Sequence, residues 1–109
     1  MIDFDGNELH VSGTVFRLEF PIQEVRELAS QIIVLFRPDA SKGPGQFRNL
    51  VAYDPEGSKL WEAELPTNYG MDAYYQLLPG PDLVADSYCS YRCHLDPNTG
   101  RITSKEFFK

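Results

Sequence analysis

The sequence has few of the residues from which disulfide frameworks and metal centres are built, since it contains only two cysteines and two histidines. Cys89 and Cys93 can close at most one tight loop, and a zinc site needs four ligands where this region offers two thiols and His94. We therefore expect reduced thiols, no bound metal and no cofactor. No membrane helix is expected either, because no run approaches the roughly 20 apolar residues that it needs.

Basic residues are also scarce. Ten Lys and Arg stand against 16 Asp and Glu, which gives a net charge of −6. Nucleic-acid binding requires cationic side chains that displace counterions, so we expect no DNA or RNA partner, and the acidity favours a basic protein partner. Acidity that only keeps a small protein in solution explains the same numbers. The first residues, Met1 to Asp5, are acidic where a secretion signal is basic and then apolar, which predicts a cytoplasmic protein.

A short turn sequence occurs twice. Asp54-Pro55-Glu56-Gly57-Ser58-Lys59-Leu60 returns as Asp96-Pro97-Asn98-Thr99-Gly100-Arg101-Ile102, and each copy lies between short apolar runs. Asp opens such a turn, Pro fixes the first central φ, and Gly takes the position with φ > 0. The repeat therefore predicts two similar hairpins of an antiparallel sheet.

The remaining pattern predicts a single all-β domain over residues 1–109, since the composition, 42% hydrophobic and 13% aromatic, suits one packed core. An N-terminal hairpin joins Glu8–Val11 to Thr14–Phe20. Residues 22–30 fit either a helical stripe or a strand, and we choose the strand. An internal repeat, approximately 24–65 and 73–108, then contains two four-stranded units: 24–28, 32–37, 48–53 and 59–65, followed by 73–78, 82–86, 91–95 and 101–108.

Two segments carry a family resemblance. Leu95 to Ile102 resembles the strand-turn-strand of β-propeller repeats of the quinoprotein and WD type, and Val51 to Asp54 with Leu60-Trp61 resembles the same repeat. The resemblance implies two blade-like units, whereas propellers close with about four to eight blades. The units therefore form a sandwich, a barrel or a partial propeller, or their open edges pair with a second copy or another protein. The pattern also resembles small bacterial proteins, toxin-neutralising immunity proteins among them.

Binding candidates lie in and beside the loops. Arg37 and Arg48 bracket the Gly/Pro-rich segment 38–46, and loops held between rigid strands often carry binding function. Tyr69 and Tyr88 fall in or next to loops, and tyrosine is frequent in interface hot spots. Trp61 shares a strand face with Ala63 and Leu65, which favours the core. With His94, these residues form the candidate binding set: Arg37, Arg48, Tyr69, Tyr88 and His94.

No catalytic pattern emerges. Asp96-x-Asn98-x-Gly100 resembles the start of a calcium loop but lacks a third oxygen ligand, and Phe107 stands where a bidentate Glu would be required. Glu62 and Glu64 share a strand face that we expect to be solvated, and no nucleophile elbow occurs. The sequence thus predicts a non-catalytic protein-binding module, with an immunity protein that blocks a basic toxin as one form of it. The alternatives are a small hydrolase or ligand-binding protein that uses the 38–47 loop with Tyr69 and His94, and a homo-oligomer.

Overall fold

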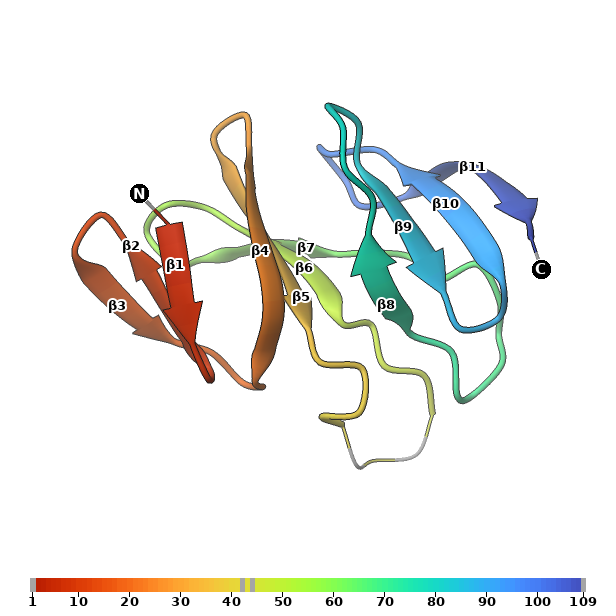
Figure 1. The fold of residues 1–109 in the computed structure, drawn as a ribbon, viewed down its shortest axis with the longest axis horizontal. Coiled ribbons are helices and arrows are strands. Elements are labelled where there is room, and N and C mark those ends of the chain that lie inside the picture. Colours follow the sequence, from red (N-terminus) through yellow and green to blue (C-terminus); the bar gives the residue numbers. More distant parts are fainter. Residues whose placement is uncertain (1, 42, 44, 109) are drawn as a thin grey trace.

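The computed structural model describes residues 2–41, 43 and 45–108. Within them the chain is all-β, with strands arranged in three antiparallel sheets (Figure 1). The N-terminal sheet contains β1 (Ile2–Asp5), β2 (Glu8–Val11) and β3 (Thr14–Arg17). The central sheet contains β4 (Ile22–Leu28), β5 (Gln31–Phe36), β6 (Leu50–Tyr53) and β7 (Lys59–Glu62). The C-terminal sheet contains β8 (Tyr74–Leu77), β9 (Val84–Ser87), β10 (Tyr91–Leu95) and β11 (Ile102–Phe107).

The predicted all-β, antiparallel fold with two four-stranded units is confirmed, and each unit is a meander in which sequential strands pair. Residues 22–28 form a strand, as chosen over a helix. The N-terminal hairpin gains a third strand, β1, that the sequence analysis did not predict. Its alternation places Ile2 and Phe4 toward the core while Asp3 and Asp5 face solvent, so four residues suffice to form it.

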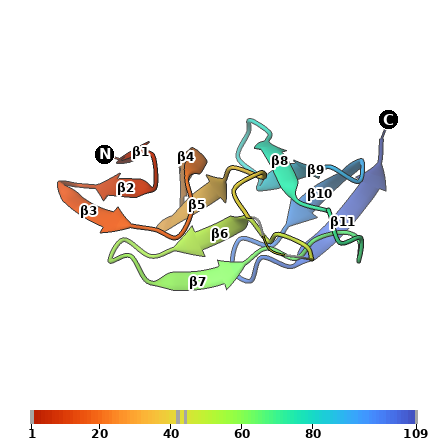
Figure 2. The ribbon, with the colours of Figure 1, turned by 90° about the horizontal axis from the view of Figure 1, so that it is seen from below.

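The central sheet lies between the other two and is covered on both faces (Figures 1 and 2). Alternate residues of β5 point to opposite faces, so Ile32 and Val34 pack toward the N-terminal sheet while Ile33 and Leu35 pack toward the C-terminal sheet. This double burial explains the continuous apolar run from Ile32 to Phe36, in which every residue is buried. Trp61 belongs to the core between the central and C-terminal sheets, as predicted from its strand face.

The resemblance to β-propellers is wrong at the level of the fold. The three sheets are separate and open, and they do not close around an axis. The turn motif that carried the resemblance instead reports local hairpin chemistry. Asp54 Oδ1 accepts hydrogen bonds from the backbone N–H of Glu56 and Ser58, and Asp96 Oδ1 accepts one from that of Asn98. Any hairpin with an Asx-type turn uses these bonds.

The two turn glycines also make the same contact with a neighbouring sheet. Gly57, in the β6–β7 turn, has φ +88° and lies under the ring of Phe16 from β3. Gly100, in the β10–β11 turn, has φ +76° and lies under the ring of Trp61 from β7. In each case an aromatic ring from the last strand of one sheet covers the last hairpin turn of the next sheet. We call this the ring-on-glycine contact.

A buried polar side chain joins the central sheet to the C-terminal sheet. Asn49 is fully buried, and its Nδ2 donates to the backbone oxygens of Phe36 (2.9 Å) and Tyr74 (2.7 Å). Its Oδ1 accepts from the backbone N–H of Tyr74 at 2.9 Å. The β5–β6 ladder ends at Leu35, and Tyr74 is the first residue of β8. The bonds from Asn49 therefore satisfy backbone groups of Phe36 and Tyr74 that have no ladder partner where the two sheets meet. Asn49 therefore fixes how the two sheets align.

Candidate functional site

The described parts of three connections lie along one side of the central and C-terminal sheets, the lower side in Figure 1. They are the loop from 37 to 49 after β5, the loop from 66 to 73 before β8, and the turn between β9 and β10 (Figure 1). Backbone hydrogen bonds join them, from Phe47 N to Asp72 O (3.3 Å) and from Tyr88 N to Ala73 O (3.0 Å). The Gln46 side chain also donates to the carbonyl of Thr67. Segments far apart in the sequence are therefore held as one surface.

Asp72 is the centre of this arrangement. Asp72 is only 1% exposed, and its Oδ2 accepts a hydrogen bond from the Thr67 hydroxyl at 2.8 Å. Its Oδ1 accepts from the backbone N–H of Ala73 at 3.0 Å and of Cys89 at 3.3 Å. A buried carboxylate is tolerated only with such partners. Asp72 thus pins the 66–73 loop to the β9–β10 turn.

An apolar surface stands on this platform. Tyr69, Met71 and Tyr88 are 62%, 75% and 58% exposed, and we call these three side chains the tyrosine face. They border a surface cavity of 410 Å³ lined by Pro38, Asp39, Tyr69, Met71, Tyr88 and Cys89. The Tyr88 ring packs on that of Tyr75, with 5.1 Å between centroids. Large apolar side chains grouped on a surface are typical of interaction sites.

The structure distributes the five predicted binding residues over several places. It brings Tyr69 and Tyr88 together, at the start of the 38–47 loop. Arg37 is exposed at the end of β5, where its backbone N–H bonds to Pro21 O at 3.0 Å. Arg48 lines a different cavity, described below. His94 is exposed beside a third cavity of 310 Å³, which Asp82 also lines, and the two are not within ion-pair distance in the described residues.

A cavity with a volume of 530 Å³ lies beside β6 and β7. Its base is buried and apolar or aromatic, from Phe36, Val51 and Tyr53, and Phe20 and Phe47 form half-buried walls. The ring of Phe20 meets those of Phe36 and Phe47 edge-on, with centroids 5.5 and 4.8 Å apart. We call this the aromatic cavity.

Charged residues form the rim of the aromatic cavity: Glu19, Arg48, Lys59 and Glu62. Lys59 Nζ lies 2.8 Å from Glu62 Oε2, and this hydrogen bond raises the pKa of Lys59. Burial, and then the charges of Glu19 and Glu62, raise the pKa of Tyr53 to about 12, so its hydroxyl stays protonated at neutral pH. Arg48 is among the binding residues predicted from the sequence, whereas Tyr53 and the three phenylalanines are not, because only the stacking of the sheets brings them together.

The C-terminal sheet carries an ion pair between the buried Asp86 and the partly exposed Arg92. Arg92 donates to Asp86 through Nε at 2.9 Å and through Nη2 at 3.2 Å, and Gln76 Nε2 donates to the same carboxylate at 2.7 Å. Burial alone would raise the pKa of Asp86, but the hydrogen bonds from Arg92 and Gln76 outweigh it and hold this pKa below its usual range. Arg92 also lies 5.3 Å from the centroid of the Phe108 ring. The pair anchors the strands beside Tyr75.

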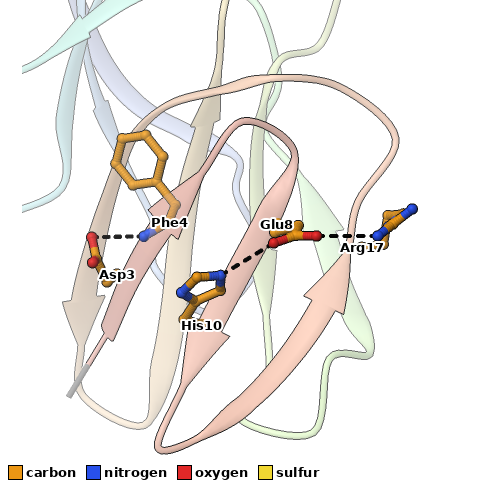
Figure 3. A network of polar contacts seen from close by, with 5 residues as sticks. All are labelled: Asp3, Phe4, Glu8, His10 and Arg17. Carbon is orange, nitrogen blue, oxygen red and sulfur yellow. Dashed lines mark hydrogen bonds and ion pairs between the residues drawn. The ribbon is translucent and has the colours of Figure 1, made fainter.

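The outer face of the N-terminal sheet carries a polar network (Figure 3). Glu8 accepts a hydrogen bond from Arg17 Nη2 at 3.1 Å, and His10 Nε2 lies 3.5 Å from the other Glu8 oxygen. Asp3 accepts from the backbone N–H of Phe4 instead. Water reaches these side chains, so their attraction is screened and adds little to stability. We interpret the network as a solvated sheet face.

Two absences concern residues 2–41, 43 and 45–108. No group of three or more His, Cys, Asp or Glu in this part of the chain is placed to hold a metal ion. None of these residues belongs to a helix with the length and hydropathy to cross a membrane. Cys89 and Cys93 are both free thiols, and burial raises the pKa of Cys93.

Fold and site together define a small all-β protein of three stacked, open antiparallel sheets with an apolar surface on its loops. The chain belongs to the family described as Domain of unknown function (DUF7957), which matches residues 1–107. The match covers nearly the whole chain and involves no quinoprotein or WD-type family, which also corrects the propeller resemblance. Comparison with curated proteins and with solved structures finds no match.

Proposed function

We propose that this protein is a non-catalytic protein-binding module whose contact surface is the tyrosine face. The observation that carries the proposal is the grouping of Tyr69, Met71 and Tyr88, all more than half exposed, beside one cavity. Tyrosine dominates interface hot spots because it buries a large apolar area and keeps a polar tip. Methionine adapts to irregular partner surfaces.

The platform beneath the tyrosine face supports this proposal. Binding costs free energy when loops become ordered, and a surface that is already ordered avoids that cost. Asp72 ties the 66–73 loop to the β9–β10 turn through its three hydrogen bonds, and the Tyr75 ring supports Tyr88. The tyrosine face is therefore preorganised for a partner.

The charge of the chain indicates the chemistry of that partner. A net charge of −6 attracts a basic protein and accelerates its association. We propose that the partner is basic, and that an immunity protein which covers a basic toxin is one form of this function. Binding should weaken as salt rises, because salt screens attraction between exposed charges.

The proposal is tested with the tagged protein as bait, against extract of the native organism and the products of neighbouring genes. Tyr69→Ser with Tyr88→Ser should weaken binding of a stoichiometric partner by about tenfold or more. Val15→Ser is the matched control, because Val15 is 55% exposed at the opposite end of the stack. Equal binding by the double variant would refute the tyrosine face as contact surface. Light scattering that finds a homo-oligomer alone would favour pairing through edges such as β11 instead.

A further inference from the structure

The aromatic cavity has features of a small-molecule site that are independent of the tyrosine face. Its volume, 530 Å³, falls in the range of ligand sites. Phenylalanine rings that meet edge-on form its apolar part, and they can receive a further ring edge-on or offset. The 38–47 loop contributes to both places, with Pro38 and Asp39 at the tyrosine face and Gln46 and Phe47 at this cavity.

One pole of the aromatic cavity has an unused cation. Lys59 is neutralised by Glu62 at 2.8 Å, whereas Arg48 has no carboxylate within 4.0 Å among the described residues. Arg48 is exposed and lines the rim of this cavity. A guanidinium presents paired donors that match a carboxylate. A ligand carboxylate is therefore favoured at Arg48.

The other pole has an unused hydroxyl. Tyr53 is 5% exposed and lines the aromatic cavity, and its hydroxyl makes no hydrogen bond with any described residue. The negative charges of Glu19 and Glu62 act on this hydroxyl, so an anionic group of a ligand would be repelled there. A neutral ligand hydroxyl suits this pole, because it can accept from Tyr53 and donate to a carboxylate. Arg48 precedes β6 and Tyr53 is its last residue, so the two lie at opposite ends of this strand. The two poles thus select opposite ends of one molecule.

We infer that the aromatic cavity binds a small aromatic carboxylate with a hydroxyl group at the end remote from its acid. The ring packs on Phe20, Phe36 and Phe47, the carboxylate pairs with Arg48, and the hydroxyl meets Tyr53. Such chemistry is offered by a free hydroxyaryl acid and by a tyrosine at the carboxyl end of a peptide.

The test uses 3-(4-hydroxyphenyl)propanoate as probe, titrated into the full chain and followed by NMR shifts and calorimetry. Arg48→Gln should weaken binding about tenfold or more, because it removes a charged hydrogen-bond partner. Arg101→Gln is the matched control, since Arg101 is an exposed arginine between β10 and β11 and does not line the cavity. It should leave the Kd within about twofold.

Tyr53→Phe tests the second pole. It should weaken the hydroxylated probe while leaving 3-phenylpropanoate, which lacks the hydroxyl, unchanged. If N-acetyl-tyrosine binds more tightly than 3-(4-hydroxyphenyl)propanoate, the natural ligand is the carboxyl end of a peptide. If it binds more weakly, the natural ligand is a free acid.

The inference is overturned if the probe does not bind at about 10 mM, if tyramine binds equally well, or if Arg48→Gln changes nothing. Tyr69→Ser should not affect the probe, so this inference and the proposed function can fail separately.

Discussion

The ring-on-glycine contact at Gly100 leads to a quantitative prediction for Gly100→Ala. A Cβ added there would lie 2.7 Å from Cδ2 of the Trp61 ring and closer still to Cε3, so the ring must move. Moving it also disturbs the hydrogen bond from Trp61 Nε1 to Pro97 O, at 3.0 Å. The turn needs φ +76°, a region that an L-residue enters at a cost of about 1–2 kcal/mol.

The expected loss in the free energy of unfolding follows from these terms. Overpacking costs about 1–3 kcal/mol, and with the backbone term the total reaches about 2–5 kcal/mol. A domain of this size has about 5–15 kcal/mol to lose, so Gly100→Ala should fold with a clearly lower midpoint. Gly57→Ala should behave in the same way, because its added Cβ meets the Phe16 ring.

Gly13→Ala is the control for the backbone term. Gly13 has φ +87°, but a Cβ there meets no atom within 4 Å. Gly13→Ala should therefore lower the free energy of unfolding by about 1–2 kcal/mol. The further loss in Gly100→Ala measures the contact with Trp61.

The assay is urea unfolding followed by the fluorescence of Trp61, the only tryptophan in the sequence. Gly100→Ala should lower the midpoint without changing the slope, and should shift the native emission of Trp61. In a Trp61→Leu background, followed by circular dichroism, the same change should cost no more than Gly13→Ala. The reasoning is refuted if Gly100→Ala and Gly13→Ala cost the same in the parent, or if the native emission is unchanged.

Three further predictions concern buried polar groups. Asn49→Ala should cost about 3 kcal/mol or more in urea unfolding, because it leaves backbone groups of Tyr74 unpaired between two sheets. Asp72→Asn should weaken partner binding at the tyrosine face with a smaller loss of about 2 kcal/mol in stability, since an amide cannot accept all three bonds. The lowered pKa of Asp86 means that its pair with Arg92 stabilises the fold above about pH 4 and loses that effect as pH falls through the folded-state pKa. Asp86→Asn should flatten this acid limb, and an unchanged pH profile would contradict the pairing.

The features predicted well from the sequence depend on local chemistry. The turns at Asp54 and Asp96 follow from hydrogen bonds within five residues, and the strand from Ile32 to Phe36 follows from its continuous apolar run. The strand β1 was not predicted because it has only four residues, although its alternation of apolar and acidic side chains and the Gly6-Asn7 turn that follows are compatible with a hairpin strand. The resemblance to propeller repeats rested on the turns at Asp54 and Asp96, which specify a hairpin but not how sheets stack, and it is wrong.

The two proposed sites also differ in how far local sequence predicts them. Tyr69 and Tyr88 could be chosen because large aromatic residues in loops have few places to be buried. The aromatic cavity could not be predicted, since Phe20, Phe36 and Phe47 lie at the ends of different connections and strands and meet only when the N-terminal sheet packs on the central one. Arg48 was predicted from its place beside the loop, but the sequence does not indicate that it lines the aromatic cavity.

The stacking of the sheets also explains where the two proposed sites lie. The central sheet is covered on both faces, so a partner or ligand reaches it only through its edges and connections. Its longest connection, from β5 to β6, starts beside the tyrosine face and ends at the aromatic cavity. The backbone bond from Phe47 to Asp72 ties the end of this loop to the residue that organises the tyrosine face. Loops held by a rigid scaffold are where binding residues concentrate, and here a single loop contributes to both proposed sites.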